Sequence, residues 1–290
     1  MEETIYDLAN AEIMRLDVDD NHWYYGAKKD ENGKLTEDKQ FYVGVTTVLD
    51  VAAPFPEGLR QYLRVTSFEE QKDRLEVTGS RGTKLHDALD RLMRAEELNS
   101  KDYPTQYEKD ALATFIQFIT FLSPGKFDTE LIVADADLRM AGTLDFTGFV
   151  DEWRLTALLD PNKYLELDSD NHYQLKEKWL DLPNDSKRIR IIIDWKFTGR
   201  NAWSHKLQVG AYKTMLNKSR PGRAATRAFT WRYSPLHKAR FDFSESEYGY
   251  KQFMWIYNTF IAFSGEFPQP PTIRRYPDKF VLYKSKEEIV

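Results

Sequence analysis

The chain has 290 residues, a net charge of -5 and 14% aromatic residues, which is enough apolar sequence for a large core and argues against a disordered protein. It contains no cysteine, which excludes disulfides, zinc-thiolate sites and iron-sulfur clusters. No apolar stretch is long enough to cross a bilayer and the N-terminus has no signal-peptide pattern. We therefore expect a cytoplasmic protein with no membrane partner, although an organellar or nuclear location stays open.

The chain divides into three predicted regions. Residues 1–78 form a β-rich and helical extension, in which residues 22–25 and 40–43 flank a charged turn as a hairpin. Residues 79–265 form the core, and residues 266–290 form a C-terminal tail. A charged insertion at about 153–188 is interpreted as a surface excursion between two strands that would otherwise be neighbours.

A helix is predicted to open at Gly79 and to end near Leu98. His86 lies at the margin of its apolar stripe. Such a histidine is usually a packed, hydrogen-bonded residue, but a neutral imidazole also suits a metal ion. Gly79 and Gly82 would let the backbone pass close to the sheet or to a nucleic-acid strand. A core helix follows, with Thr105 at its N-cap.

Acidic side chains occur in the next predicted strands. Asp145 lies among apolar residues of the segment from Leu138 to Val150, where aspartate is disfavoured. It either faces solvent or is held inward by a cation. Glu130 is a weaker candidate, because strands often begin with a polar residue.

The segment Arg190–Lys196 contains three consecutive isoleucines, which indicates a central strand buried on both faces. Asp194 and Lys196 are two residues apart and project to the same face. One interpretation is an ion pair at the end of a strand. The other is a phosphodiester-cutting site, in which the carboxylate holds a divalent cation and the lysine orients water or neutralises charge on the phosphate.

Two patterns follow this strand. Gln208 and Tyr212 are four residues apart and share one face of a helix from about Trp203 to Leu216. In the next strand, residues 227–233, basic and aromatic side chains alternate, which suits backbone contacts and base stacking.

The basic residues are concentrated in residues 187–240, which we call the basic block. It contains fourteen Lys and Arg residues and one acidic residue, Asp194, so the rest of the chain carries a net charge of -18. We expect a local basic surface of the kind that tracks a phosphate backbone, although a solvated basic face has the same composition.

The order of His86, Asp145 after Gly142, Asp194 with Lys196, and Gln208 with Tyr212 resembles the PD-(D/E)xK nuclease superfamily. Within it the chain is most similar to the RecB-like exonuclease branch, which includes phage-type and mitochondrial-genome-maintenance-type single-strand exonucleases. The resemblance covers about residues 79–216. It implies an α/β fold of the restriction-endonuclease type, with a mixed central sheet flanked by helices, to which the β-rich N-terminal region is added.

The resemblance also implies the roles of residues. His86, Asp145, Asp194 and the carbonyl of Trp195 would hold Mg²⁺ or Mn²⁺, and Lys196 would be the catalytic lysine. The side chains assigned to positioning or binding DNA are those of Gln208, Tyr212, Arg81, Arg200 and Lys206. The chain would match the members without an iron-sulfur cluster.

The implied function is a metal-dependent DNA exonuclease that acts on single-stranded or end-processed DNA in recombination, repair or replication, with proteins of those processes as possible partners. One alternative is a structure- or sequence-specific endonuclease with the same site. Another is a non-catalytic DNA-binding scaffold.

Overall fold

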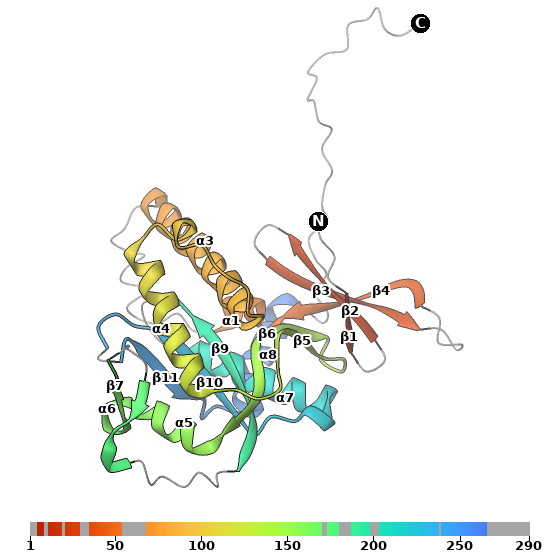
Figure 1. Cartoon of the computed structure of the whole chain (residues 1–290). Helices are drawn as coiled ribbons and strands as arrows, with labels where there is room; N and C mark the ends of the chain where they lie inside the picture. Colours follow the sequence, from red (N-terminus) through yellow and green to blue (C-terminus); the bar gives the residue numbers. More distant parts are fainter. Residues whose placement is uncertain are drawn as a thin grey trace, which may run out of the picture.

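The protein is described here from a computed structural model, which covers residues 5–8, 11–18, 21–29, 35–53, 68–169, 173–179, 187–197, 203–237 and 239–265. It is an α/β protein with a mixed nine-stranded sheet and helices on both faces, which confirms the predicted fold class (Figure 1). The strands are β1 (Ile5–Leu8), β2 (Ala11–Val18), β3 (Asn21–Lys29), β4 (Leu35–Gly44), β5 (Phe127–Asp135), β6 (Met140–Asp151), β9 (Arg188–Lys196), β10 (Arg227–Tyr233) and β11 (Phe241–Glu245).

The principal helices are α1 (Val45–Ala52), α3 (Phe68–Met93), α4 (Gln106–Leu122), α5 (Glu152–Leu159), α7 (Trp203–Ser219) and α8 (Tyr250–Ser264). The short helix α6 (Pro161–Tyr164) and the two-stranded sheet of β7 (Leu165–Leu167) and β8 (Tyr173–Leu175) lie in the predicted insertion. Among the described residues, no helix combines the length and apolarity needed to cross a membrane.

The strands form the order β1-β2-β3-β4-β6-β9-β10-β11, with β5 paired to β6. The predicted hairpin is present, because β3 and β4 are antiparallel with Trp23 opposite Val43. The strands of the N-terminal region therefore belong to the same sheet as the core. In Figure 1 these strands, coloured red, extend the sheet beyond the helices that flank the core.

β6 is the branching strand of the sheet. On one edge it pairs with β5 over residues 140–148. On the other edge β4 pairs with Met140 and Ala141, and β9 pairs with residues from Phe146 to Asp151. Residues 142–145 therefore face a fork between β4 and β9, where no strand pairing continues on that edge.

Helices α3, α4 and α5 cover one face of the sheet with an aromatic core. Trp195 of β9 and Trp231 of β10 pack edge-on against Phe115 of α4, with ring centroids 5.1 and 5.6 Å apart. Phe229, Trp231 and Tyr233 are 0%, 0% and 2% exposed. The expectation that the aromatic residues of this strand stack on bases is therefore wrong, because they face the core.

Helices α1, α7 and α8 cover the other face. Ile192 of β9 and Ala228 of β10 pack there against buried side chains of α7, such as Val209 and Met215. Ile191, Ile192 and Ile193 are all fully buried, so the strand is covered on both sides as predicted.

Two expected boundaries differ from the structure. A single helix, α3, runs from Phe68 through Gly79 and Gly82, so the expected boundary at residue 78 falls inside it. Each glycine costs a helix about 1 kcal/mol, which is less than burying leucines such as Leu85 contributes. The helix ends at Met93 rather than Leu98, because Ala95 has a φ of 60° in the left-handed region.

The insertion also differs in part. β6 and β9 are antiparallel neighbours, so the chain does leave and rejoin the sheet at adjacent strands, as expected. Helix α5, however, buries Leu155 and Leu158 in the aromatic core. This part of the insertion is not a surface excursion.

Candidate active site

The candidate site lies at the fork of β6, where the predicted acidic residues of two neighbouring strands meet. The register pairs Phe146 of β6 with Ile193 of β9, so Asp145 and Asp194 occupy facing positions at the end of this ladder. Antiparallel pairing thereby brings together two carboxylates that are 49 positions apart in the sequence.

Asp145 is held by two groups. One carboxylate oxygen, Oδ2, accepts a hydrogen bond of 2.7 Å from the backbone N–H of Trp195. The other, Oδ1, lies 3.6 Å from Nδ1 of His86, which α3 brings over the site. His86 itself packs edge-on against Phe197, with ring centroids 5.4 Å apart. The sequence prediction that these residues converge is supported by this geometry.

Asp194 and Lys196 lie on the same face of β9, as their spacing predicts. Nζ of Lys196 is 2.7 Å from Oδ2 of Asp194, and the side chains are 15% and 3% exposed. The ion pair that was the simpler interpretation is therefore present. It does not exclude the second one, because the pair lies directly beside Asp145 and His86.

The pKa values of Asp194 and Lys196 are both raised, the first chiefly by burial and the second by the neighbouring carboxylates. Burial raises the pKa of Asp194 to about 6, and the nearby Asp145 carboxylate adds to this in spite of Lys196. Burial lowers the pKa of Lys196, but Asp194 and Asp145 outweigh it, so the pKa of Lys196 lies above its ordinary value. The ammonium therefore stays charged at neutral pH.

His86 and Asp145 stabilise each other's charged forms. Burial lowers the pKa of His86, yet the Asp145 carboxylate more than offsets this and the pKa of His86 is raised. Burial raises the pKa of Asp145, but His86, Lys196 and the Trp195 N–H together bring the pKa of Asp145 below its ordinary value.

Gln208 and Tyr212 support the site from beneath. They are 7% and 3% exposed, and Nε2 of Gln208 donates a hydrogen bond of 3.0 Å to the hydroxyl of Tyr212. The Tyr212 ring packs against Gly142, where a Cβ would lie only 2.3 Å from Cε1. This burial favours the positioning role of the pair over direct contact with DNA.

The remaining predicted DNA contacts are placed differently. Arg81 of α3 lies with its guanidinium 4.4 Å from the ring centroid of Tyr107. Lys206 is half-buried on α7, and its carbonyl accepts a hydrogen bond of 2.6 Å from Ser246. Arg200 lies outside the described residues.

Two acidic residues near the site were missed or ranked low from the sequence. Glu130 of β5 lies across from Asp145, and burial together with Asp145 raises the pKa of Glu130 to about 7. Asp50 of α1 acts electrostatically on Lys196, and burial raises the pKa of Asp50. Only the pairing of β4 and β5 with β6 brings these segments to the site, so no local pattern in the sequence indicates them.

The donor set fits a divalent cation. Asp194 Oδ2 is a buried oxygen that makes no well-aligned hydrogen bond among the described residues, although Lys196 is close. Two carboxylates and an imidazole are ligands that Mg²⁺ or Mn²⁺ accepts. Within the described ranges, no group of three or more histidine or acidic side chains is placed so that it could already hold a metal ion, so the fit is one of ligand type and not of geometry.

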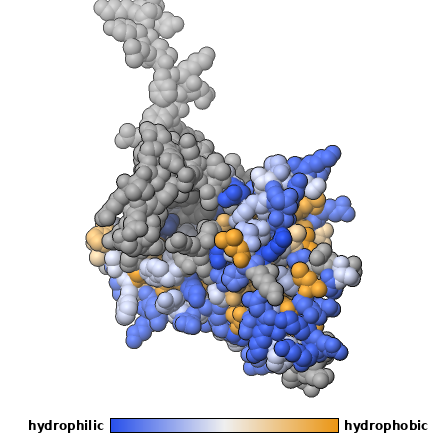
Figure 2. Space-filling view, turned by 90° about the vertical axis from the view of Figure 1, so that its left-hand side faces the viewer, coloured by the Kyte–Doolittle hydropathy of each residue, from blue (hydrophilic) through white to orange (hydrophobic). Residues whose placement is uncertain are grey.

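The basic block does not form one free basic surface. Most of its residues are paired with acids, and all but one of these acids lie outside the block. The paired residues are Arg188, Arg190, Lys196, Lys218, Arg223, Arg227, Arg232 and Arg240. The expected phosphate-tracking surface is thereby reduced, because charges segregated along the chain are neutralised in space. Figure 2 shows a mainly hydrophilic face in its described part, with small separate hydrophobic patches.

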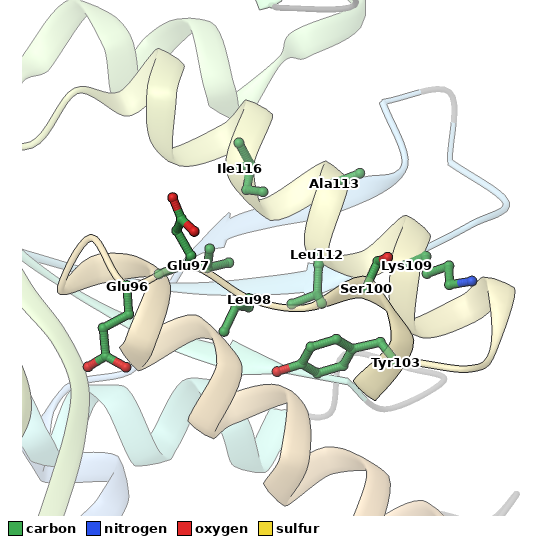
Figure 3. A pocket seen from close by; sticks show the side chains of 10 residues that line it. Glu96, Glu97, Leu98, Ser100, Tyr103, Lys109, Leu112, Ala113 and Ile116 are labelled. Carbon is green, nitrogen blue, oxygen red and sulfur yellow. The ribbon is translucent and has the colours of Figure 1, made fainter.

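A hollow of about 540 Å³ lies apart from these residues, between the end of α3 and α4 (Figure 3). Its wall is largely apolar, with Leu98, Leu112 and Ile116, and Glu96 and Glu97 lie at its rim. Its lining contains no residue of the candidate site.

Neither the models of known protein families nor the curated protein sequences give a match to this chain.

Proposed function

We propose that this chain is a metal-dependent nuclease that hydrolyses phosphodiester bonds of DNA and works as an exonuclease on single-stranded or end-processed DNA. The observation that carries the proposal is the convergence of Asp145 and Asp194 beside Lys196 and His86. The exonuclease mode rests on the ordered resemblance to the RecB-like branch.

His86, Asp145, Asp194 and the carbonyl of Trp195 would hold Mg²⁺ or Mn²⁺. Such a cation, when bound, activates water and polarises the phosphorus centre. It would also relieve the repulsion between the two carboxylates, which burial otherwise makes costly.

The protein's own groups contribute orientation and charge. The Trp195 N–H fixes the carboxylate of Asp145, and Gln208 and Tyr212 hold the adjoining backbone at Gly142. Lys196 is charged and largely buried, with part of its side chain still exposed, so it can neutralise charge that develops on the phosphate or orient the attacking water.

Asp194→Asn and Lys196→Met test the proposal. Each should lower the cleavage rate of end-labelled single-stranded DNA by about 100-fold or more, because each removes a group that acts on the reacting phosphate. Rates are measured with Mg²⁺, with Mn²⁺ and with chelator, and thermal melting verifies folding. Lys213→Ala is the control, because Lys213 is a lysine of α7 that contacts the Thr226 carbonyl just before β10, at the opposite end of the β9–β10 pair from Lys196.

Linear and circular single-stranded DNA substrates distinguish exonuclease cleavage from endonuclease cleavage. An exonuclease spares the circle, whereas an endonuclease opens it. Salt-sensitive binding without metal-dependent cleavage would refute the enzyme and leave a DNA-binding scaffold. Full activity in either variant would refute the assignment of the site.

A further inference from the structure

The imidazole of His86 is held by two contacts. Its Nδ1 lies 3.6 Å from Oδ1 of Asp145, and its ring packs edge-on against the ring of Phe197, at a centroid distance of 5.4 Å and an interplanar angle of 83°. The His86 side chain is nevertheless 30% exposed, so part of it faces solvent. The Asp145 contact fixes one ring nitrogen, and the Phe197 contact fixes the plane of the ring.

Phe197 is the residue that follows β9, and it is anchored on two sides. Its ring is 6% exposed and lies edge-on to Trp231 of the aromatic core, with centroids 6.1 Å apart. Its carbonyl lies just beyond the last pair of the β9–β10 ladder, Lys196 with Arg232. This carbonyl accepts a hydrogen bond of 3.2 Å from the hydroxyl of Tyr107. Tyr107 therefore holds the chain at the point where the strand pairing ends.

Tyr107 is fixed in turn by groups of two other elements. It lies in the first turn of α4, and its ring packs edge-on against Tyr233 of β10 with centroids 5.0 Å apart. The guanidinium of Arg81 lies 4.4 Å from the centroid of the same ring. Arg81 and His86 both belong to α3, so the contacts form a closed path from α3 through α4 and the end of β9 back to α3. The core helix α4 reaches the candidate site by this path.

We infer that Phe197 and Tyr107 are positioning residues, which hold the His86 imidazole in the orientation in which it binds the cation. The inference rests on the metal site of the proposed function. A metal ligand has to be held within about 10–20° of its productive orientation, and packing and hydrogen bonds behind the ligand supply this precision. Without the Phe197 ring, the partly exposed imidazole would rotate toward solvent and lose part of its contact with the ion.

Binding of Mn²⁺ in the absence of DNA tests the positioning role. Phe197→Leu should raise the Kd for Mn²⁺ about 10- to 100-fold, the range for a lost partner of a metal ligand. Tyr107→Phe removes only the hydroxyl and should raise this Kd about 5-fold, the factor that corresponds to one neutral hydrogen bond. The electron paramagnetic resonance signal of free Mn²⁺ measures binding, and thermal melting verifies the folding of each variant.

Two matched controls remove the same kinds of group elsewhere. Tyr173→Phe deletes a hydroxyl that donates a hydrogen bond of 2.6 Å to a backbone carbonyl, and Phe229→Leu removes a fully buried aromatic ring of β10. Both should leave the Kd for Mn²⁺ unchanged. If Phe197→Leu does not fold in the thermal melt, Tyr107→Phe and its control decide the question.

A spectroscopic signature separates positioning from stabilisation of the fold. The nitrogen of a coordinated imidazole modulates the electron spin echo of bound Mn²⁺, so the wild-type protein should show this modulation and His86→Asn should lose it. At equal occupancy by Mn²⁺, Phe197→Leu should show a weaker modulation than the wild-type protein, and both controls should match the wild-type protein. A purely structural role of Phe197 would lower the melting temperature and leave the modulation unchanged.

The outcomes distinguish this inference from the proposed function. The positioning role is overturned by an unchanged Kd in both variants, by an unchanged modulation in Phe197→Leu, or by a wild-type protein without nitrogen modulation. Metal-dependent cleavage of DNA by the wild-type protein would leave the nuclease intact in each case. Conversely, loss of both Mn²⁺ affinity and nitrogen modulation in Phe197→Leu, with no cleavage of any DNA by the wild-type protein, would support the positioning role and refute the nuclease.

Discussion

Glu130 has a φ of 49° at the point where β5 should pair with Asp145 of β6. The regular pairing is interrupted there, since the paired residues of β5 pass from Thr129 to Leu131. Positive φ is strained for a glutamate. The strained backbone places a carboxyl group with a pKa of about 7 next to an ionised aspartate.

Glu130→Gln should stabilise the metal-free protein at high pH. The pKa of Glu130 is about 7 in the folded protein and 4.5 ordinarily, so the folded state binds the proton more tightly and loses stability as pH rises through this interval. At pH above 7 the variant should gain about 1–3 kcal/mol in the free energy of unfolding, and near pH 4 the gain should vanish. Urea denaturation in the presence of a metal chelator measures this free energy of unfolding.

Glu166→Gln, on the exposed side of β7, serves as the control and should change little at any pH. A difference between Glu130→Gln and the wild-type protein that is the same at pH 4 and at pH 8 would contradict the explanation.

Some of these residues could be predicted singly. The spacing of Asp194 and Lys196 on a strand dictates that they share a face, and the side chains do meet. The sequence left two possibilities for Asp145, which could face solvent or be held inward. In the structure a hydrogen bond from the Trp195 N–H holds its carboxylate inward. Glu130 was only a weak candidate and Asp50 was not predicted at all, because their proximity to the site depends on strand neighbours that are distant in the sequence.

At the level of elements, α7 packs closely against β6 at one glycine, Gly142. Gly142 leaves room for the Tyr212 ring, and a side chain there would overlap Cε1. This contact also holds the fork residues of β6 against α7, the helix that follows β9.

Gly142→Ala should therefore destabilise the protein by about 1–3 kcal/mol, the usual cost of overpacking. Chemical denaturation measures it, and Tyr212→Leu in the same chain should recover part of the loss because it removes the overlapping ring atoms. Gly222→Ala, whose added Cβ meets no atom within 4 Å among the described residues, should have little effect. Equal effects at the two glycines would show that the Tyr212 contact is not the cause.

Elements with strong local signals could be predicted well. The capping box of Thr105 and Glu108 begins α4, and Ser123, in the left-handed region at a φ of 45°, ends it. The start of α3 could not be predicted. Locally, Gly79 and Gly82 indicate the beginning of a helix, but in the folded protein tertiary packing keeps both glycines inside one longer helix.

At the level of the whole molecule, charge along the chain and charge in space are different distributions. Arg190 and Arg223 both pair with Asp128, and Lys218 pairs with Asp135. A compact fold brings acidic segments to the basic block, so only part of its charge is left for a ligand.

Single-stranded DNA binding should therefore depend on salt less steeply than the sequence implies. An excess of 13 charges, if all were used, would give a slope of about -9 in a plot of log K against log salt, whereas two to five phosphate contacts give about -1.5 to -3.5. Fluorescence anisotropy at several KCl concentrations, in chelator, measures the slope. A value steeper than about -6 would contradict the neutralised basic block.

The overall layout followed from sequence in its main lines. The resemblance of the ordered motifs implied an α/β fold with a mixed central sheet, and the insertion between β6 and β9 was recognised as such. The fork of β6 could not be predicted, because strand order depends on contacts between distant segments, and the periodicity of one segment does not encode them.

Trp195 connects two parts of the molecule, the acidic groups of the site and the aromatic core. Its N–H fixes Asp145, while its indole ring interlocks with Phe115, Phe118 and Trp231 in the core. The acidic groups are thus as rigid as the interior on which they stand. For the proposed nuclease, adaptation to differently shaped substrates would then come from the surrounding loops or from bending of the nucleic acid rather than from rearrangement of these acids.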